Sequence, residues 1–331
     1  MVQNDGDRSW TTVAPSVDDA LRRGRPVVAL ESTVFAHGLP HPAGVETALA
    51  MEEDVRRAGA VPATIGLVDG RLCVGLSPEQ IERLATEPGV AKVGRRDLGV
   101  VAATGRCGAT TVGGTLAAMA LVGLRVMATG GIGGVHRGAE QTFDVSGDLT
   151  ELGRVPAVVV CAGAKAVLDL PKTLEALETL GVPVVGFETD EFPAFYSRAS
   201  GLPVLARADT PQQVARMAAT HWALGSTSSL LLAAPVPPEV EIPRDVVEAA
   251  VTTALHVAEQ QGLRGPAVTP FLLEEVRRAT GDRSLRANIA LLRNNARLAA
   301  RIAAALSATT AAPAPRRARR SANKSPADRE A

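Results

Sequence analysis

The sequence has few cysteines and no net charge, and each shortage argues against a class of protein. Its three cysteines, in 331 residues, form no C-x-x-C pair, which argues against a disulfide framework and a zinc cluster. Lysine plus arginine equals aspartate plus glutamate, at 35 each, which argues against a nucleic-acid surface or a polybasic membrane patch over the body of the chain. We therefore expect no nucleic-acid partner, and the unpaired cysteines fit a reducing, cytoplasmic location.

Long apolar runs and nucleotide motifs are also missing. A membrane-spanning helix takes about 20 predominantly apolar residues. The uncharged run 107–124 is too short for such a span, and the run 217–238 is interrupted by glycine, a Ser/Thr cluster and three prolines. No Gly-Lys-Ser/Thr signature is present, and His136 stands where the third glycine of the dinucleotide fingerprint would be. We expect neither a membrane partner nor a standard nucleotide-binding motif.

Aromatic residues make up only 3% of the chain, yet four of the nine fall between residues 187 and 196. This concentration predicts a local wall of aromatic side chains. Such a wall either packs in the core or covers a pocket, and core packing is the more common outcome.

Short apolar runs typical of buried strands alternate with segments of helical periodicity between residues 15 and 306. No repeat and no linker divides this region. The alternation predicts a single α/β domain at residues 13–306, with layered α/β/α architecture around a mixed sheet. Residues 1–12 are expected to be a disordered tail. Residues 307–331, rich in Ala and Pro with a basic cluster at 316–320, are expected to be a second, solubilising tail.

Two titratable residues lie shortly after predicted buried strands. Glu31 comes after the apolar run 26–30, and Lys165 follows closely after the run of valines at 158–160. The exit of a strand is a common position for catalytic groups in α/β folds. A desolvated lysine near other cations can be a neutral amine, as Schiff-base chemistry on a carbonyl requires. The alternatives are a capping or solvated glutamate and an ion-paired lysine.

Loops elsewhere carry groups suited to anions and cations. Lys92 begins a cationic segment at 92–96 that fits either an anion clamp or a solvated loop. In the glycine-rich run 129–138, His136 suits a phosphate or a sugar, although a surface turn would show the same pattern. Asp144 and Asp148 favour a hard, largely hydrated cation such as Mg²⁺ or Mn²⁺, with a loop cap as the alternative for Asp144.

Taken without any family, these residues predict a lyase or transferase that acts on a phosphorylated sugar. A glycosidase with two catalytic carboxylates, Glu31 and an aspartate, is conceivable, but it leaves Lys165 without a role. The predicted helix at 284–306 contains asparagines, which are poor helix formers unless they bond something. Asn288 and Asn295 are seven residues apart and therefore lie on one face of that helix.

Several blocks of sequence are long and distinctive. They are LEST at 30–33, HGLP at 37–40, KVGRRDL at 92–98, ATGGIGGVHRG at 128–138, FDVSGD at 143–148, CAGAK at 161–165, TDEFPAFY at 189–196, TPFLL at 269–273 and ANIA at 287–290. In this order they resemble the pseudouridine-5'-phosphate glycosidases, also called the indigoidine synthase A-like family. The resemblance covers about residues 15–303.

The resemblance implies a lyase-class enzyme that reversibly cleaves the C–C glycosidic bond of pseudouridine 5'-phosphate to uracil and ribose 5-phosphate. It also implies one Mn²⁺ or similar hard divalent cation per subunit and a homotrimeric assembly. By position, Glu31 would be the proton donor, Lys165 the nucleophile that forms a Schiff base, and Asp144 the metal ligand. The implied substrate contacts are Lys92, Val112, His136, Ser146, Gly147, Asp148 and Asn288.

Two positions depart from the family pattern. Gly94 stands where a serine is expected, and Gly147 stands where alanine is usual. Neither departure removes a catalytic group, and the loss expected at Gly94 is at most one phosphate contact. Two further functions stay open, namely a Schiff-base lyase or aldolase on another sugar phosphate and a non-catalytic accessory protein of the same fold.

Overall fold

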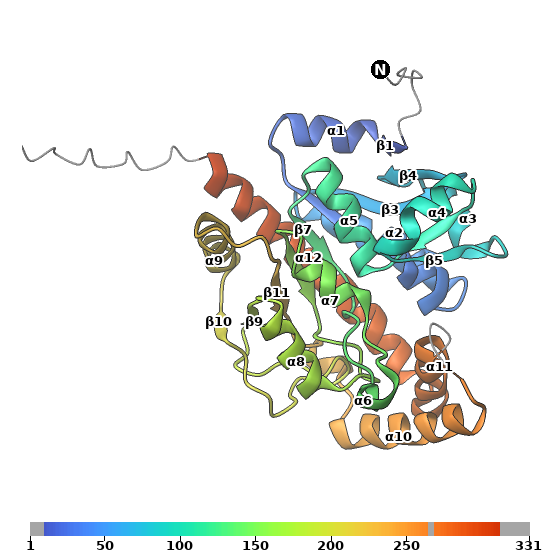
Figure 1. Cartoon of the computed structure of the whole chain (residues 1–331). Helices are drawn as coiled ribbons and strands as arrows, with labels where there is room; N and C mark the ends of the chain where they lie inside the picture. The colour runs from blue at the N-terminus through green and yellow to red at the C-terminus, as the bar shows by residue number, and fades with distance from the viewer. Residues whose placement is uncertain (1–9, 264–267, 312–331) are drawn as a thin grey trace, which may run out of the picture.

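The computed structural model describes residues 10–263 and 268–311, which form an 11-stranded sheet with helices around it (Figure 1). The strands are β1 (Thr11–Val13), β2 (Val27–Leu30), β3 (Val61–Val68), β4 (Arg71–Val74), β5 (Ala91–Val93), β6 (Gly108–Thr110), β7 (Val126–Ala128), β8 (Val158–Cys161), β9 (Val184–Phe187), β10 (Ala206–Ala208) and β11 (Leu230–Ala233). Their order along the sheet is β1-β4-β3-β2-β7-β8-β11-β9-β10, and β6 joins β5 to β3.

The sheet is mixed but mostly parallel. Only the pairs β3–β4 and β3–β6 are antiparallel among the described strands. The β3–β4 hairpin turns at Asp69 and Gly70, both of which have positive φ, as the Asp-Gly sequence predicts. The central strands β2, β7, β8 and β11 are buried along their whole length, because helices cover a parallel sheet on both sides.

The helices are α1 (Pro15–Arg22), α2 (Ala43–Arg57), α3 (Pro78–Thr86), α4 (Leu98–Ala103), α5 (Val112–Val122), α6 (Ala139–Thr142), α7 (Gly147–Leu152), α8 (Leu170–Thr179), α9 (Pro211–Ala223), α10 (Arg244–Gln260), α11 (Val268–Thr280) and α12 (Arg283–Ala311). Three shorter helical turns are the π-helix η1 (Val34–Gly38) and the 3₁₀ turns η2 (Arg95–Asp97) and η3 (Pro238–Val240). None of the described helices is long and apolar enough to span a bilayer.

The helices form a layer on each face of the sheet (Figure 1). The long helix α12 packs across β2, β7 and β8 and contacts α2 and α9, whereas α5 packs with α7 against β2 and β3. A connection from one parallel strand through a helix to the next is right-handed. Two such connections that run in opposite directions across the sheet therefore place their helices on opposite faces. The expected α/β class with a layered, mixed sheet is confirmed.

Helix α12 is fixed to α2 by a buried carboxylate. Asp54 on α2 accepts hydrogen bonds from Arg293 Nε at 2.7 Å and from Arg297 Nη1 at 3.3 Å, both on α12. A carboxylate that is removed from water needs such charged donors. The contact fixes the position of α12, whose inner face carries Asn288 and Asn295 toward the sheet.

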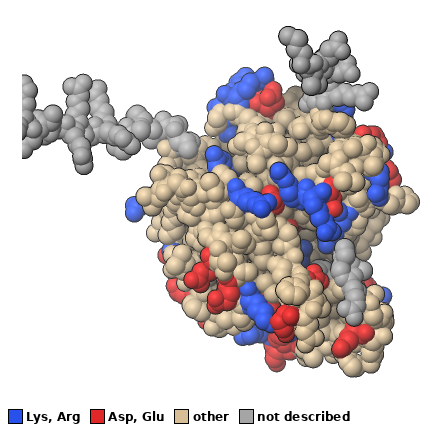
Figure 2. Space-filling model, in the orientation of Figure 1, with Lys and Arg blue, Asp and Glu red and all other residues tan. Residues whose placement is uncertain are grey.

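Both expected tail boundaries shift. Thr11 and Thr12, expected in the tail at 1–12, belong to β1, which pairs with β4. Residues 307–311 of the expected tail at 307–331 are helical, because α12 continues to Ala311 through Ser, Ala and Thr residues. The remaining parts of both tails, 1–9 and 312–331, lie outside the described residues. Lysine, arginine and acidic side chains all occur on the face seen in Figure 2, in line with the zero net charge.

Candidate active site

Three neighbouring parallel strands end at the same edge of the sheet, and the residues after them form the centre of the site. Leu30 at the end of β2 pairs with Ala128 at the end of β7, which pairs with Val160 of β8. Glu31, Thr129 and the loop to Lys165 follow these strand ends. The carboxyl ends of parallel strands are where α/β proteins place their ligands. The sheet order therefore brings together the two catalytic residues expected from the sequence.

The Glu31 carboxyl is buried, with 6% of the residue exposed. Its Oε1 accepts a hydrogen bond from Thr129 Oγ1. Burial raises the pKa of Glu31 above its ordinary value, while Lys165, the Thr129 hydroxyl and Lys92 act in the opposite direction. A carboxyl that keeps its proton at higher pH is suited to act as a general acid. This burial excludes a solvated glutamate, and the hydrogen bond to Thr129 is one to a side chain and not to the start of a helix.

Thr129 is itself held by helix α12. The Nδ2 atom of Asn295, a fully buried residue, donates to the backbone oxygen of Thr129 at 2.8 Å. Asn295 thereby fixes the residue that bonds to Glu31. The sequence signalled Asn295 by its unfavourable place inside a helix, but Thr129 carried no signal of its own.

Lys165 lies in a tight loop after β8. Gly163 has a φ of 88°, and a Cβ there would lie 2.4 Å from the Pro193 backbone oxygen. The Lys165 amide donates to the Ile132 oxygen at 3.1 Å, and its side chain, which is half-buried, lines a pocket with Glu31 and Thr129. No carboxylate in the described part of the chain forms an ion pair with Lys165. The structure therefore contradicts the alternative of an ion-paired lysine.

Lys92 on β5 lines the same pocket. The residue as a whole is exposed, but partial burial of its ammonium and the nearby Lys165 lower the pKa of Lys92, with Asp148, Glu31 and Asp144 opposing them. Because Lys92 faces this pocket, the anion-clamp interpretation of the cationic segment is favoured at this residue. Arg96 instead pairs with its neighbour Asp97 at 3.3 Å and is exposed.

Asp148 joins two backbone segments. Its Oδ1 accepts from the Gly113 amide at 2.7 Å, and its Oδ2 accepts from the Gly133 amide at 2.9 Å. Both carboxylate oxygens are thus engaged with the backbone, at the start of α5 and in the glycine-rich loop. Ser146 Oγ accepts from the Asp148 amide at 3.2 Å and caps α7.

The remaining expected contacts offer mainly backbone groups. Val112 is buried at the first position of α5, so only its backbone N–H, which has no partner within the helix, is suited to a substrate contact. Gly147 is exposed, and a Cβ there would meet no atom within 4 Å. At Gly94 a Cβ would lie 3.5 Å from Asp97 Oδ2, an ordinary contact. Both departures from the family pattern are therefore places where the usual side chain fits.

His136 and Asp144 lie beside one another at the cationic side of the site. The His136 Nδ1 and Asp144 Oδ2 atoms are 3.9 Å apart. The backbone N–H of His136 also donates to the backbone oxygen of Asp144 at 3.1 Å. Burial lowers the pKa of His136 below its ordinary value. The negative charge of Asp144 raises this pKa, and the positive charges of Lys92 and Lys165 lower it further. The neighbouring Arg137 forms a two-pronged ion pair with Glu248 on α10, which satisfies its charge.

Asp144 is suited to a hard cation and not to zinc. The described residues contain no group of three His, Cys, Asp or Glu side chains that would hold a metal by themselves. Structural zinc sites need four protein ligands and catalytic ones three. Magnesium-like ions keep most of their waters and bind through one or two carboxylates plus substrate phosphate. The half-buried carboxylate of Asp144 fits an ion of this second kind.

A second pocket, of about 210 Å³, adjoins the one around Glu31. The two share the lining residues His37, Gly38, Leu273 and Asn288. Asn288, expected as a substrate contact, is thus placed in the site. His37 was missed as a site residue, although its HGLP block marked it and the π-helix η1, a frequent feature of functional sites, carries it.

The aromatic residues at 187–196 both pack in the core and line the pockets. Phe192, Phe195 and Tyr196 are each no more than 3% exposed and belong to the core. Phe195 also lines the pocket around Glu31, and Tyr196 lines the adjoining pocket. The ring of Phe195 lies so close to Gly131 that a Cβ there would be 2.6 Å from it.

We predict that Gly133→Ala destabilises the site. A Cβ at this position would lie 2.2 Å from Ser146 Oγ and 2.8 Å from Asp148 Oδ2, so the carboxylate that joins α5 to the loop has to move. Such overpacking costs about 1–3 kcal/mol. Urea denaturation measures the loss, with Gly147→Ala, which meets no atom, as the matched control. Equal stability of the two variants would contradict the geometry described for Gly133.

The chain is similar to proteins of one family along most of its length. The family model described as indigoidine synthase A like protein matches residues 16–305. A pseudouridine-5'-phosphate glycosidase of Solibacter usitatus is 53% identical over 87% of this chain and 96% of its own length. One from Herpetosiphon aurantiacus is 55% identical over 87% and 95%, respectively.

Two solved structures share the fold. One is a prealnumycin C-glycosynthase in complex with ribulose 5-phosphate, which is 42% identical, covers 92% of this chain and 99% of its own, and has a TM-score of 0.85. The other is an indigoidine synthase A-like protein from Thermotoga maritima, which is 38% identical, covers 92% and 100%, respectively, and has a TM-score of 0.83.

Proposed function

Because the chain belongs to the indigoidine synthase A-like family and is more than half identical to pseudouridine-5'-phosphate glycosidases, it is an enzyme with that activity, and we propose that it acts through an imine on Lys165. The observation that carries this proposal is the pocket that Glu31 and Lys165 share. In it a buried carboxyl lies near a lysine that forms no ion pair with any carboxylate in the described part of the chain. We propose further that the reaction is reversible, cleaving pseudouridine 5'-phosphate to uracil and ribose 5-phosphate.

The bond to be broken joins C1' of the ribose to C5 of uracil, so no heteroatom leaving group can simply be protonated and expelled. In the proposed first step the Lys165 amine bonds to C1', the C1'–O4' bond breaks, and the Glu31 proton goes to O4'. The nitrogen next gives a proton to the Glu31 carboxylate. The nitrogen lone pair then forms the C1'=N bond, the C1'–C5 bond breaks, and C5 takes up the proton from Glu31. Water hydrolyses the imine, which releases ribose 5-phosphate and restores the Lys165 amine.

The remaining residues bind and orient the substrate in this proposal. Lys92 and His136 hold the ribose phosphate, together with backbone groups of Val112 and of Ser146–Asp148. Lys92 also lines the pocket of Lys165, and the nearby Lys165 helps to lower the pKa of Lys92. Asn288 contacts the substrate from α12.

Asp144 is the proposed ligand of one Mn²⁺ or similar hard cation per subunit. When bound, such an ion supplies positive charge beside the phosphate of the substrate. His136, next to Asp144, would face the same region. A homotrimer is the proposed assembly, and light scattering coupled to gel filtration measures it.

The C-glycosynthase relative favours a second candidate, the joining of a sugar phosphate to a carbon other than C5 of uracil. The glycosidase relatives are more similar to this chain than the glycosynthase is, at 53–55% against 42% identity, which favours uracil. An aldolase on another sugar phosphate and a non-catalytic accessory role are two further candidates. Incubation with pseudouridine 5'-phosphate, with and without added Mn²⁺, separates all of them.

We expect uracil and ribose 5-phosphate to appear in equal amounts in this assay, with more product when Mn²⁺ is present. Chromatography with absorbance detection quantifies the uracil, and a coupled sugar-phosphate assay quantifies the second product. Absence of uracil under both conditions would overturn the proposed function.

Borohydride reduction in the presence of ribose 5-phosphate is expected to attach the sugar to Lys165, because reduction converts the imine into a stable amine. Peptide mass spectrometry locates the adduct. Lys165→Ala should lose turnover by at least about 10³-fold, as loss of a nucleophile does, while still binding ribose 5-phosphate. Lys172→Ala, which removes an exposed lysine, is the control. An active enzyme that yields no adduct on Lys165 would refute the imine.

Thr129→Val should move the alkaline limb of the kcat/KM profile to higher pH. The Thr129 hydroxyl lowers the pKa of Glu31, so its removal raises that pKa, and the proton donor stays protonated to a higher pH. A hydrogen bond to a charged group corresponds to a shift of about one pH unit. The control is Thr104→Val, at the exposed residue that follows α4. An unchanged limb, or a shift to lower pH, would be inconsistent with Glu31 as the donor.

A further inference from the structure

Two polar atoms at the border of the two pockets lack a hydrogen-bond partner. Among the described residues, the buried side-chain atoms without a partner are His37 Nε2, Asn288 Oδ1 and Asn295 Oδ1. His37 and Asn288 both line the pocket around Glu31 and the adjoining one. An unpaired buried polar group costs about 1–3 kcal/mol. A ligand that supplies a donor to such an atom recovers part of this cost.

The His37 ring presents an acceptor at this place. The ring forms a hydrogen bond with the backbone of Ala91, and since Nε2 has no partner, that bond belongs to Nδ1. Burial lowers the pKa of His37, the Ala91 bond opposes this, and Lys92 adds to the lowering. The neutral ring therefore donates its Nδ1–H to the backbone and keeps a bare Nε2.

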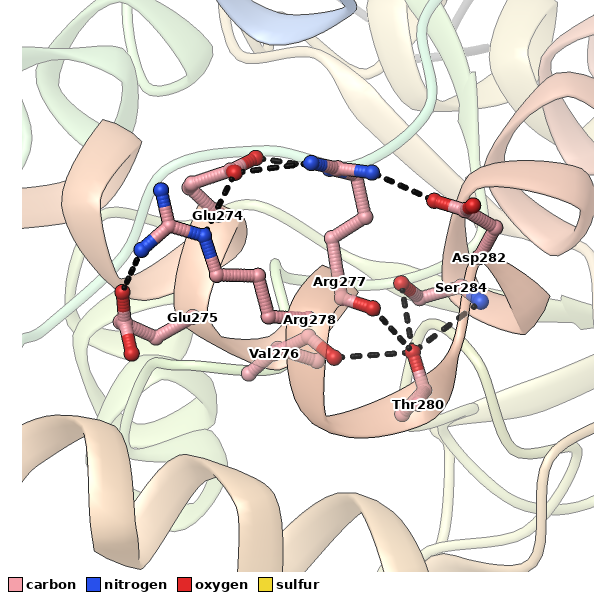
Figure 3. A network of polar contacts seen from close by, with 8 residues as sticks. All are labelled: Glu274, Glu275, Val276, Arg277, Arg278, Thr280, Asp282 and Ser284. Atoms are coloured by element: carbon pink, nitrogen blue, oxygen red, sulfur yellow. Dashed lines mark hydrogen bonds and ion pairs between the residues drawn. The ribbon is translucent and has the colours of Figure 1, made fainter.

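Apolar side chains lie beside His37 in the pocket, which Lys92 lines as well. Val34, Phe195 and Leu273 supply apolar surface to the pocket. Arg277, in the wall of the adjoining pocket, has its charge satisfied by Glu274 at 2.7 and 2.8 Å and by Asp282 (Figure 3). Figure 3 shows this network at the corner between α11 and α12. No charge in it is left free for a phosphate.

His136 lies in a cationic part of the site, because Lys92 and Lys165 both lower its pKa. It is not among the residues that line the pocket of His37. A sugar phosphate is favoured near His136, and a neutral planar ring is favoured beside His37 and the apolar side chains of the pocket. Glu31 and Lys165 line this pocket as well. The scissile bond of a molecule with a phosphate at one end and a base at the other would thus lie beside Glu31 and Lys165.

We propose that His37 is a specificity residue whose Nε2 accepts a hydrogen bond from a ring N–H of the base, an inference that rests on the function proposed above. A pyrimidine linked through C5 keeps both its N1–H and its N3–H, whereas one linked through N1 has lost the first. A buried acceptor placed for an N–H strongly rejects an analogue that lacks it, because the acceptor then stays unpaired. His37 therefore contributes to the choice of a C-linked over an N-linked nucleotide.

The synthetic direction tests this inference, because base and sugar phosphate are then separate substrates. His37→Phe, which keeps a flat ring but has no acceptor, should raise the KM for uracil about 10- to 100-fold, in line with loss of one buried hydrogen bond. The KM for ribose 5-phosphate should stay unchanged. His37→Gln, which places an oxygen acceptor near the same point, should recover part of the loss. An unchanged KM for uracil in His37→Phe would overturn the inference.

Methylated bases give a second measurement that uses the wild-type enzyme as its reference. At least one of 1-methyluracil and 3-methyluracil should inhibit the wild type at least about 10-fold more weakly than uracil, and this difference should shrink in His37→Phe. Equal inhibition of the wild type by all three bases would overturn the inference even if the variant does not fold. Borohydride trapping of ribose 5-phosphate on Lys165 is run alongside. Failure to trap refutes the proposed function, whereas trapping with an unchanged uracil KM refutes only the role of His37.

Discussion

The burial of one carboxyl group at the end of a central strand is the constraint on which the rest of the site depends. Glu31 follows β2, has almost no contact with water, and cannot carry a charge there without partners. The register of β2, β7 and β8 supplies those partners, since Thr129 and Lys165 follow the adjacent strand ends. Helix α12 then fixes Thr129 through Asn295. Burial keeps the proton on Glu31, whereas Thr129 and Lys165 stabilise the carboxylate that forms once the proton has been given up.

The site also combines cationic and apolar groups. Lys92 and Lys165 line the pocket around Glu31 together with His37, Phe195 and Leu273. Asp148 connects the glycine-rich loop to the start of α5 by accepting a backbone N–H group from each. A molecule with an anionic end and a neutral ring is held by different groups at its two ends, which orients it. Orientation of this kind lowers the entropic cost of reaching the transition state.

Much of the fold and the centre of the site could be predicted from local sequence. Apolar runs marked β2 and β8, the Asp-Gly pair marked the β3–β4 turn, and polar residues directly after strands marked Glu31 and Lys165. What could not be predicted depends on contacts between distant segments. Thr129 has a role only because Asn295 and Glu31 lie beside it, and the acceptor of His37 is visible only once the ring is seen to bond to Ala91. Short strands such as β6 and β10 have no periodicity to detect, because they exist through their neighbours' hydrogen bonds.

The central claim is that Glu31 is a buried carboxyl that keeps its proton above the pH at which an ordinary glutamate loses it. Infrared difference spectroscopy of the wild type against Glu31→Gln, recorded as a function of pH, measures this directly. The account predicts a protonated carboxyl band that is absent from the variant and that titrates above the ordinary glutamate pKa of about 4.3. A band that disappears at or below that value would contradict the account.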